Sequence, residues 1–326
     1  MTPADYKQII DGFSNKHILV IGDCMLDEWL WGKVSRISPE APVPVVEVTN
    51  RTYTPGGAAN VVNNLCSLGA AVSVAGVIGN DDSGKLLLKE LESRGVDTRC
   101  LLTNDKRPTT TKTRIIAHHQ QVVRADLETT DVISESISAR LIEALENGPA
   151  FDAVLVSDYG KGVVNRLLMR DLVKYAKNNN IILTGGPKPA NIDFFRRFHL
   201  VSLNEQEASN ATGIKVKNGD TLGLAGGKLL ANLLCNAILI TRGEHGMSLF
   251  IDDGTIKHIP ALATEVYDVS GAGDTVLATL TLALTCGAGL LDAVHLANYA
   301  AAVVVRKLGT ATLTAEELIA SSKNEG

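Results

Sequence analysis

The sequence predicts an α/β protein with a doubly wound, mostly parallel sheet flanked by helices and a small β-lid. Short apolar runs that end in Gly, Asp, Ser or Asn recur along the chain, and segments with helical periodicity lie between them. This alternation is typical of parallel strands that helices cover on both faces. The composition agrees, because 45% of the residues are hydrophobic and only 4% are aromatic.

Five apolar runs predict the strands of the main sheet, at residues 18–21, 72–75, 153–156, 181–183 and 237–240. The periodicity predicts helices between them. Residues 59–68 place apolar side chains on one stripe and end at Gly69, and residues 85–94 end at Gly95. Glycine readily takes the left-handed backbone conformation that closes a helix, so both helices should end there.

Two segments break the alternation and predict the lid. Residues 29–53 predict extended chain, with three prolines ahead of a β-branched run, and residues 109–127 predict a pair of strands without a helix. Five basic residues face one acidic residue within 104–124, where an anionic small molecule could be held, although a solvated charged surface explains them equally well. No repeats or long linkers occur, so we expect one domain, residues 1–326, with both segments inserted in it.

Composition and net charge argue against several classes of function, namely nucleic-acid binding, disulfide or zinc sites, and membrane insertion. The net charge of −5 supplies no basic field for nucleic acid. The five cysteines are odd in number and widely spaced, which indicates a reducing compartment rather than disulfides or zinc. The apolar stretch 275–291 is interrupted by threonines and glycines and predicts a buried helix rather than a membrane span. We therefore expect a cytoplasmic protein without nucleic-acid or membrane partners.

A glycine-rich turn ahead of that apolar stretch carries the sharpest chemical signal. Residues 268–274 read Asp-Val-Ser-Gly-Ala-Gly-Asp, and a glycine-rich turn entering a helix presents several N–H groups and the helix dipole to an anion. Asp274 would lie at the rim of such a phosphate site, where a carboxylate is useful if it accepts a proton from an attacking hydroxyl. The alternative is a helix N-terminus at which Asp274 only satisfies unpaired amides.

Several motifs resemble the ribokinase-like (PfkB) carbohydrate kinases. The segment 268–274 resembles their C-terminal signature, and Pro-Gly-Gly-Ala-Ala-Asn at 55–60 resembles their N-terminal substrate motif. Further matches at 22–27, 35–46, 120–126 and 157–162 resemble the members of this family that act on D-glycero-β-D-manno-heptose 7-phosphate. The chain ends at Gly326, soon after the matched region, so the resemblance is to the stand-alone form without a fused nucleotidyltransferase.

This resemblance implies a set of site residues. Asp274 would deprotonate the acceptor hydroxyl, and the amides of Gly271, Ala272 and Gly273 would hold the transferring phosphoryl group. The sugar phosphate would lie among residues that match substrate positions or supply cations: Asp23, Asp27, Gly56, Gly57, Asn60, Arg114, Asp158, Lys161 and Lys188. ATP would lie beside Asn204, Glu207, Thr241, Arg242, Gly243 and Asn298, and Glu207 would place Mg²⁺ through water. Asp268 and Gly309 could help hold a monovalent cation. On the residues alone, Asp23 could be a turn residue and Glu207 a first-turn helix residue.

The resemblance implies an ATP-dependent kinase that phosphorylates the anomeric O1 of the heptose 7-phosphate, in ADP-heptose and lipopolysaccharide core biosynthesis. The exposed extended segments also favour a homodimer formed through the lid, because edge strands of lids can pair across a two-fold axis. One departure stands out, because Gly186 occupies the place before Pro-Lys where these kinases usually have Asp. The alternatives are another ribokinase-like sugar or nucleoside kinase, or a catalytically silent sugar-nucleotide sensor.

Overall fold

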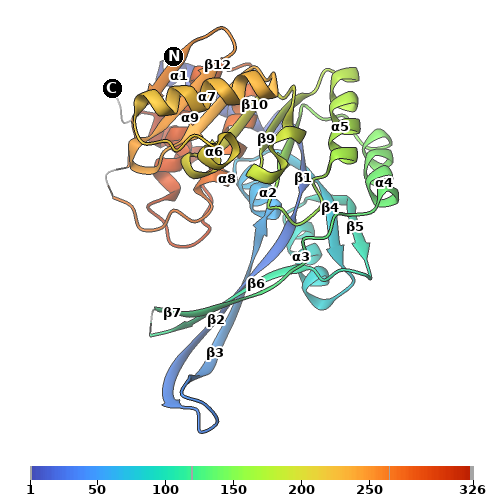
Figure 1. Ribbon diagram of the computed structural model, residues 1–326, viewed down its shortest axis with the longest axis vertical. Coiled ribbons are helices and arrows are strands. Elements are labelled where there is room, and N and C mark those ends of the chain that lie inside the picture. Colours follow the sequence, from blue (N-terminus) through green and yellow to red (C-terminus); the bar gives the residue numbers. More distant parts are fainter. Residues whose placement is uncertain (1, 119, 264, 324–326) are drawn as a thin grey trace.

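The computed structural model describes residues 2–118, 120–263 and 265–323, and it contains two sheets (Figure 1). Within the described residues, the large sheet has nine strands in the order β13-β12-β11-β10-β9-β8-β1-β4-β5. All neighbouring pairs are parallel except β11 with β12 and β12 with β13. The bounds of these strands are β1 His17–Gly22, β4 Ala71–Gly79, β5 Asp97–Asn104, β8 Ala153–Ser157, β9 Ile182–Gly186, β10 Leu200–Asn204, β11 Ala237–Thr241, β12 Met247–Ile251 and β13 Ile256–Ile259.

Helices cover both faces of this sheet. The bounds are α1 Pro3–Asp11, α2 Ala58–Ser67, α3 Asp82–Glu92, α4 Glu135–Glu146, α5 Arg166–Asn178, α6 Glu205–Thr212, α7 Gly219–Leu233, α8 Ala272–Thr285, α9 Leu290–Val304 and α10 Ala315–Lys323. Short 3₁₀ turns are η1 Phe13–Asn15, η2 Pro189–Phe195 and η3 Gly243–His245. Apolar residues of α1, α2, α3, α8, α9 and α10 join one core, and those of α4, α5, α6 and α7 join the other. The doubly wound arrangement is confirmed.

The strand β1 explains why two cores form. Ile18 and Val20 belong to one core, whereas Leu19 and Ile21 belong to the other, and all four are fully buried. A strand buried on both faces must be apolar at every position, because successive side chains point to opposite faces. The two helix ends also agree with expectation, since Gly69 has φ +93° and Gly95 has φ +75°.

The lid is a second, four-stranded sheet in the order β3-β2-β6-β7. Its strands are β2 Cys24–Ile37, β3 Pro44–Gly57, β6 Thr110–Ala117 and β7 Gln120–Leu127. β2 pairs antiparallel with β3 and parallel with β6, and β6 pairs antiparallel with β7. Figure 1 shows these strands leaving the α/β body as a long arm. Both lid segments are therefore strands, and β2 and β3 reach further into the body than the expected 29–53.

The apolar stretch 275–291, predicted as one buried helix, is divided: α8 ends at Thr285, and Leu290 begins α9. Every residue of α8 from Thr275 to Ala283 is buried. Among the described residues, no helix combines the length and the apolar character that a membrane crossing requires.

Candidate active site

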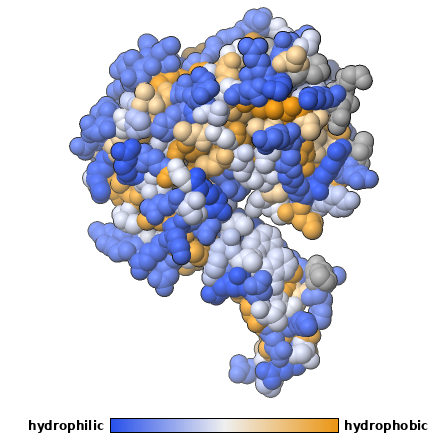
Figure 2. All heavy atoms as spheres, turned by 180° about the vertical axis from the view of Figure 1, so that it is seen from behind, coloured by the Kyte–Doolittle hydropathy of each residue, from blue (hydrophilic) through white to orange (hydrophobic). Residues whose placement is uncertain are grey.

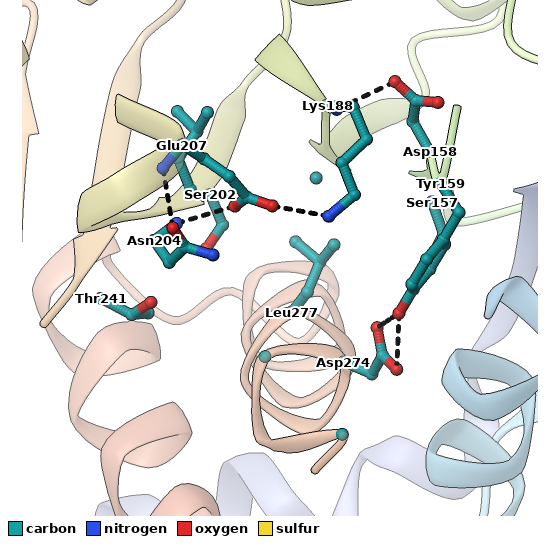
Figure 3. Close-up of a pocket in the computed structure, with 14 residues that line it drawn as sticks. Ser157, Asp158, Tyr159, Lys188, Ser202, Asn204, Glu207, Thr241, Asp274 and Leu277 are labelled. Atoms are coloured by element: carbon teal, nitrogen blue, oxygen red, sulfur yellow. Dashed lines mark hydrogen bonds and ion pairs between the residues drawn. The ribbon is translucent and has the colours of Figure 1, made fainter. Parts of the chain in front are cut away.

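The carboxyl ends of five neighbouring strands, β1, β8, β9, β10 and β11, meet at one edge of the large sheet. Ligands of open α/β sheets bind outside this edge, where the strand order reverses. A cavity of about 210 Å³ opens there (Figure 3). Its lining includes many predicted site residues and several unpredicted ones: Ser157, Asp158, Tyr159, Gly186, Lys188, Ser202, Leu203, Asn204, Glu207, Thr241, Gly271, Gly273, Asp274 and Leu277.

The start of α8 forms one wall of this cavity. Gly271 precedes the helix with φ +79°, and a Cβ there would lie 2.9 Å from Nδ2 of Asn60, so the close approach of α8 to α2 requires glycine. Gly271 and Gly273 line the cavity. The amide of Ala272 instead donates to the carbonyl of Val269 at 3.2 Å. The predicted anion site is therefore a glycine-lined helix start in which the Ala272 amide already has an acceptor.

Asp274 lies in the first turn of α8 and is held by two donors. Nδ2 of Asn60 donates to its Oδ2 at 2.7 Å. The hydroxyl of Tyr159 donates to Oδ1 at 2.8 Å and lies 3.0 Å from Oδ2 (Figure 3). Burial raises the pKa of Asp274 to about 6, against the opposing effect of these hydrogen bonds and of Lys188. A carboxyl group with such a pKa can accept a proton near neutral pH and release it again.

Lys188 and Glu207 form an ion pair across the cavity. Nζ of Lys188 lies 2.6 Å from Oε1 of Glu207 and 5.2 Å from the ring centroid of Tyr159. Oε2 of Glu207 accepts the amide of Asn204 at 3.0 Å, and Oδ1 of Asn204 accepts the amide of Glu207 at 2.7 Å. This reciprocal capping box begins α6. Glu207 is therefore both a first-turn helix residue and part of the cavity wall.

Two predicted sugar ligands, Asp23 and Asp158, are buried anchors for backbone. Asp23 follows β1, and its carboxylate accepts the amides of Tyr159, Lys161 and Val163 at 2.8–3.1 Å. Asp158 follows β8, and its carboxylate accepts the amides of Gly160 and Lys188 at 2.8 and 2.9 Å. Burial raises the pKa of Asp158. The structure thus gives both carboxylates a role within the fold, because hydrogen bonds to the protein occupy their oxygens, and Asp23 lies outside the cavity lining.

Asp27, the third carboxylate among the predicted sugar ligands, lies on the lid strand β2. Nη1 of Arg114 lies 2.6 Å from its Oδ1, and the same guanidinium packs 4.7 Å from the ring centroid of Trp29. A Cβ on Gly56 would lie 2.4 Å from Oδ2 of Asp27, so the substrate-motif glycine allows this close approach. Gly57 has φ +58° and precedes α2.

Lys161, in the loop after β8, and Lys112, on the lid strand β6, are paired with acidic side chains. Nζ of Lys161 lies 2.7 Å from Glu128, and Nζ of Lys112 lies 3.1 Å from Asp126 and 3.4 Å from Glu128. Of the cations counted in the sequence window, Lys112, Arg114 and Arg124 are thus paired with carboxylates from outside that window.

Of the predicted nucleotide-binding residues, some lie at or beside the cavity, whereas Asn298 lies outside its lining. Thr241 ends β11 and lines the cavity. Arg242 lies 3.7 Å from Glu205, and Gly243 begins η3 with φ +55°. Asn298 is buried on α9, where its Nδ2 donates to the carbonyl of Pro260 at 2.8 Å. Asn298 therefore holds the chain that leaves β13 and lies outside the cavity lining.

Asp268 and Gly309, the candidate cation residues, bond to each other. Oδ2 of Asp268 accepts the amide of Gly309 at 3.0 Å, and Oδ1 accepts the amide of Ser270 at 2.9 Å. Burial opposes the charged carboxylate, but these hydrogen bonds outweigh it and lower the pKa of Asp268. The pair fixes the turn that leads into Gly271.

Tyr159 is the main site residue that the sequence reasoning left without a role. The motif at 157–162 contains it, but a tyrosine in a motif does not reveal its partner. The available signal was its place two residues after the end of β8, at the sheet edge where the other polar residues lie.

Comparisons with known proteins show the family to which the chain belongs. A family model described as "pfkB family carbohydrate kinase" matches residues 15–317. A protein of Geobacter metallireducens named "Bifunctional protein HldE" is 46% identical over 304 residues, which cover 93% of this chain and 62% of the relative. A protein of Helicobacter hepaticus with the same name is 44% identical over 303 residues, covering 93% of this chain and 63% of the relative. The chain thus spans less than two thirds of the length of these relatives.

Solved structures share the fold. Arabidopsis thaliana ribokinase complexed with ribose and ATP superimposes with a TM-score of 0.74 at 18% identity, covering 94% of this chain and 99% of that chain. The tetrameric inhibited form of phosphofructokinase-2 from Escherichia coli superimposes with a TM-score of 0.79 at 15% identity, covering 95% and 99%. Given the family match over most of its length, the chain belongs to the pfkB family of carbohydrate kinases and is a sugar kinase.

Proposed function

We propose that this sugar kinase transfers the γ-phosphoryl group of ATP to the anomeric O1 of D-glycero-β-D-manno-heptose 7-phosphate, giving the 1,7-bisphosphate for ADP-heptose and lipopolysaccharide core biosynthesis. The motifs that resemble heptose 7-phosphate kinases support this substrate, as do the relatives named HldE. The observation that carries the chemistry is Asp274, a partly buried carboxyl group with a pKa of about 6 at a glycine-lined helix start.

In the proposed reaction, the carboxylate of Asp274 accepts the proton of the O1 hydroxyl as that oxygen attacks the γ-phosphorus. The new bond joins O1 to phosphorus, the bond from phosphorus to the β-phosphate oxygen breaks, and ADP leaves. The start of α8 supplies a positive helix dipole and the backbone of Gly271 and Gly273 on the cavity wall, which favour the charge of the phosphoryl oxygens. Closure of the lid over the sugar would exclude water.

The cations Arg114, Lys161 and Lys188 are the proposed partners of the 7-phosphate. Each is paired with a carboxylate in the structure, at distances of 2.6–2.7 Å. A phosphate can replace such a carboxylate without leaving the cation buried and unpaired. We propose Asp27, Gly56 and Asn60 as groups beside the sugar and assign Asp23 and Asp158 to holding the loop beneath it.

The donor set also fits magnesium. Glu207 and Asn204 line the cavity, and among the described residues no group of three metal-ligating side chains gathers. Both oxygens of Glu207 already accept hydrogen bonds, from Lys188 and from the Asn204 amide, but each retains capacity for one more. Such a site suits an ion held mainly by phosphate oxygens and water. When bound, Mg²⁺ would neutralise charge on the ATP phosphates, while Thr241, Arg242 and Gly243 would flank the nucleotide.

A lid-mediated homodimer and a cytoplasmic location complete the proposal. Exposed apolar side chains gather on the lid, including Val48 at 52% and Val123 at 48% exposure, and Figure 2 shows apolar patches on the arm. Every residue of the edge strand β7 is exposed. Surfaces of this kind favour pairing with a second copy. ATP and a phosphorylated sugar are both cytoplasmic metabolites, which supports that location.

The variant Asp274→Asn tests the chemistry. It should lower ADP release by about 10²–10⁴-fold, the range for loss of a general base, while ATP binding by calorimetry stays close to wild type. The matched control is Asp82→Asn, an exposed aspartate in the first turn of α3. Wild-type turnover in Asp274→Asn would exclude it as the base.

A coupled ADP-release assay tests the substrate. Heptose 7-phosphate, ribose, fructose and adenosine are compared on the wild-type protein, and the heptose 7-phosphate should give the highest kcat/KM. Preference for a neutral sugar or a nucleoside would favour another kinase of this family. Thermal stabilisation by the sugar phosphate without ADP release would favour the silent sensor, for which Gly186 on the cavity wall is the motivation.

A further inference from the structure

Tyr159 lies between Asp274, the proposed base, and Lys188, a proposed partner of the sugar phosphate. Its hydroxyl reaches both oxygens of Asp274, at 2.8 and 3.0 Å, and its ring faces the ammonium group of Lys188 at 5.2 Å (Figure 3). Its own amide donates to the buried carboxylate of Asp23 at 2.8 Å. The tyrosine is therefore fixed at its backbone and aimed at the base.

The two oxygens of Asp274 are not equivalent in this arrangement. Oδ2 accepts from Asn60 at 2.7 Å and lies near Tyr159, whereas Oδ1 has Tyr159 as its donor. A carboxylate oxygen offers two lone pairs, so Oδ1 keeps more capacity for a further proton. Burial raises the pKa of Tyr159 well above its usual value, and Asp274 adds to this effect. The hydroxyl therefore remains protonated and acts as a donor.

We propose that Tyr159 is a positioning residue for the phosphoryl transfer, whose hydroxyl orients the Asp274 carboxylate so that Oδ1 receives the proton of the acceptor hydroxyl. This inference rests on the proposed function and deepens it. It assigns Tyr159 no contact with substrate. In the same proposal, Asn60 donates a hydrogen bond that fixes Oδ2 of Asp274, in addition to any contact with the sugar.

Other charged groups also face Asp274. Asp27 on β2 raises its pKa and Lys188, after β9, lowers it. Arg114 on β6 pairs with Asp27, and Glu207 on α6 pairs with Lys188. These groups remain when only the hydroxyl of Tyr159 is removed. The hydrogen bond from Tyr159 lowers the pKa of Asp274, so its loss must raise that pKa.

The test is Tyr159→Phe, measured as kcat/KM against pH in the ADP-release assay. The acid limb should move to higher pH by about one unit, the size expected for one hydrogen bond to a charged acceptor. At pH 7 the rate should fall about twofold, because about half of the carboxyl group is then protonated, and it should recover as the pH rises, with the KM for ATP unchanged. Tyr175→Phe is the matched control, because Tyr175 is a partly buried tyrosine on α5 whose hydroxyl donates to the carbonyl of Leu145. Its profile should match wild type.

A direct titration separates this inference from the proposed function. In protein labelled with ¹³C at aspartate carboxyl carbons, the Asp274 signal is identified by its absence in Asp274→Asn. Its midpoint should be higher in Tyr159→Phe than in wild type, with no substrate present. Absence of ADP release in wild type would refute the proposed function, whereas an unmoved midpoint would refute the role of Tyr159.

A second variant keeps the fold and strengthens the donor. Replacement of Tyr159 by 3-fluorotyrosine retains the hydroxyl and makes it more acidic, so the acid limb and the carboxyl midpoint should move to lower pH. A uniform loss of rate at every pH with an unmoved limb, in either variant, would overturn the proposal in favour of packing alone. A rise in the KM for sugar without a change in the limb would also overturn it, in favour of direct substrate contact.

Discussion

At the scale of single residues, the site holds a carboxyl group under conditions that disfavour its charge. Burial raises the folded-state pKa of Asp274 from 3.8 to about 6. Between these values the folded protein binds more protons than the unfolded chain, so this group makes the protein less stable as the pH rises from 4 to 6. Above pH 6 the whole cost is present. The proposed base therefore exchanges some stability for reactivity.

This decrease of stability with rising pH leads to a prediction for the stability of Asp274→Asn. At pH 7.5 the variant should be more stable than wild type by about 1 kcal/mol. This value is smaller than the full free-energy equivalent of the pKa shift, because the carboxyl group is partly open to the cavity and solvent screens its charge. Oδ1 of Asn60 has no hydrogen-bond partner in the described part of the chain, so its amide can turn and accept from the new side-chain amide. Thermal unfolding at pH 7.5 and pH 4 measures the difference.

The gain in the unfolding temperature should be about 2 °C at pH 7.5 and should disappear near pH 4. Asp82→Asn controls for the chemical change itself. Equal destabilisation at both pH values would contradict a strained carboxylate at position 274.

At the scale of elements, the loop after β8 depends on a carboxylate from the end of β1. Asp23 accepts three amides of residues 159–163, and this loop carries Tyr159 toward α8. Three hydrogen bonds to one buried charge hold the loop more firmly than its own short-range contacts can.

Asp23→Asn should therefore destabilise the protein by about 2–3 kcal/mol, because an amide group must then face one of three N–H donors. Urea unfolding measures the change in stability, and kcat/KM should fall with it as Tyr159 loses its anchor. Asp11→Asn, at an exposed end of α1 where the aspartate pairs with Lys7, is the control. A loss below about 0.5 kcal/mol, typical of surface substitutions, would show that the loop holds itself.

The elements also show what the sequence could predict. Long apolar runs such as β1 and β8 were foreseeable, because a strand buried on both faces is apolar throughout. β10 was missed, since Ser202 interrupts its five residues, and the antiparallel pair β12 and β13 lies outside the βαβ pattern.

In the site, the glycine-rich turn and Asp274 were predictable from local spacing. The bonds from Tyr159 to Asp274 and from Asp23 to the loop join residues more than 100 positions apart, so they follow from packing that no local pattern records. A local pattern likewise could not show how the lid cations are paired. A count over 104–124 found an excess of cations, but Asp27 and Glu128, which pair with Arg114 and Lys112, lie outside that window.

At the scale of the whole molecule, the lid arm connects the candidate active site to the proposed dimer surface. β2 begins at Cys24 beside the sheet edge, contributes Asp27, and runs into the arm over a total length of 14 residues (Figure 1). A partner bound to the far part of the arm would thus act on a strand that carries a proposed substrate ligand. Dimer formation and sugar binding would share β2.

The proposed dimer predicts the behaviour of Val123→Glu on the edge strand β7. Burying a charge against the apolar surface of a second copy is costly, so the variant should sediment as a monomer at concentrations where wild type is a dimer. Its exposed side chain makes little contribution to the fold, and the unfolding temperature should stay close to that of wild type. The matched control is Leu224→Glu, because Leu224 on α7 is 64% exposed and lies away from the lid. Sedimentation of wild type as a monomer, or of both variants as dimers, would contradict an interface on the lid. Arg114, a proposed partner of the sugar phosphate, lies on β6, which pairs with β7. The Val123→Glu monomer should therefore also show a higher KM for the sugar phosphate than the control, with the KM for ATP unchanged.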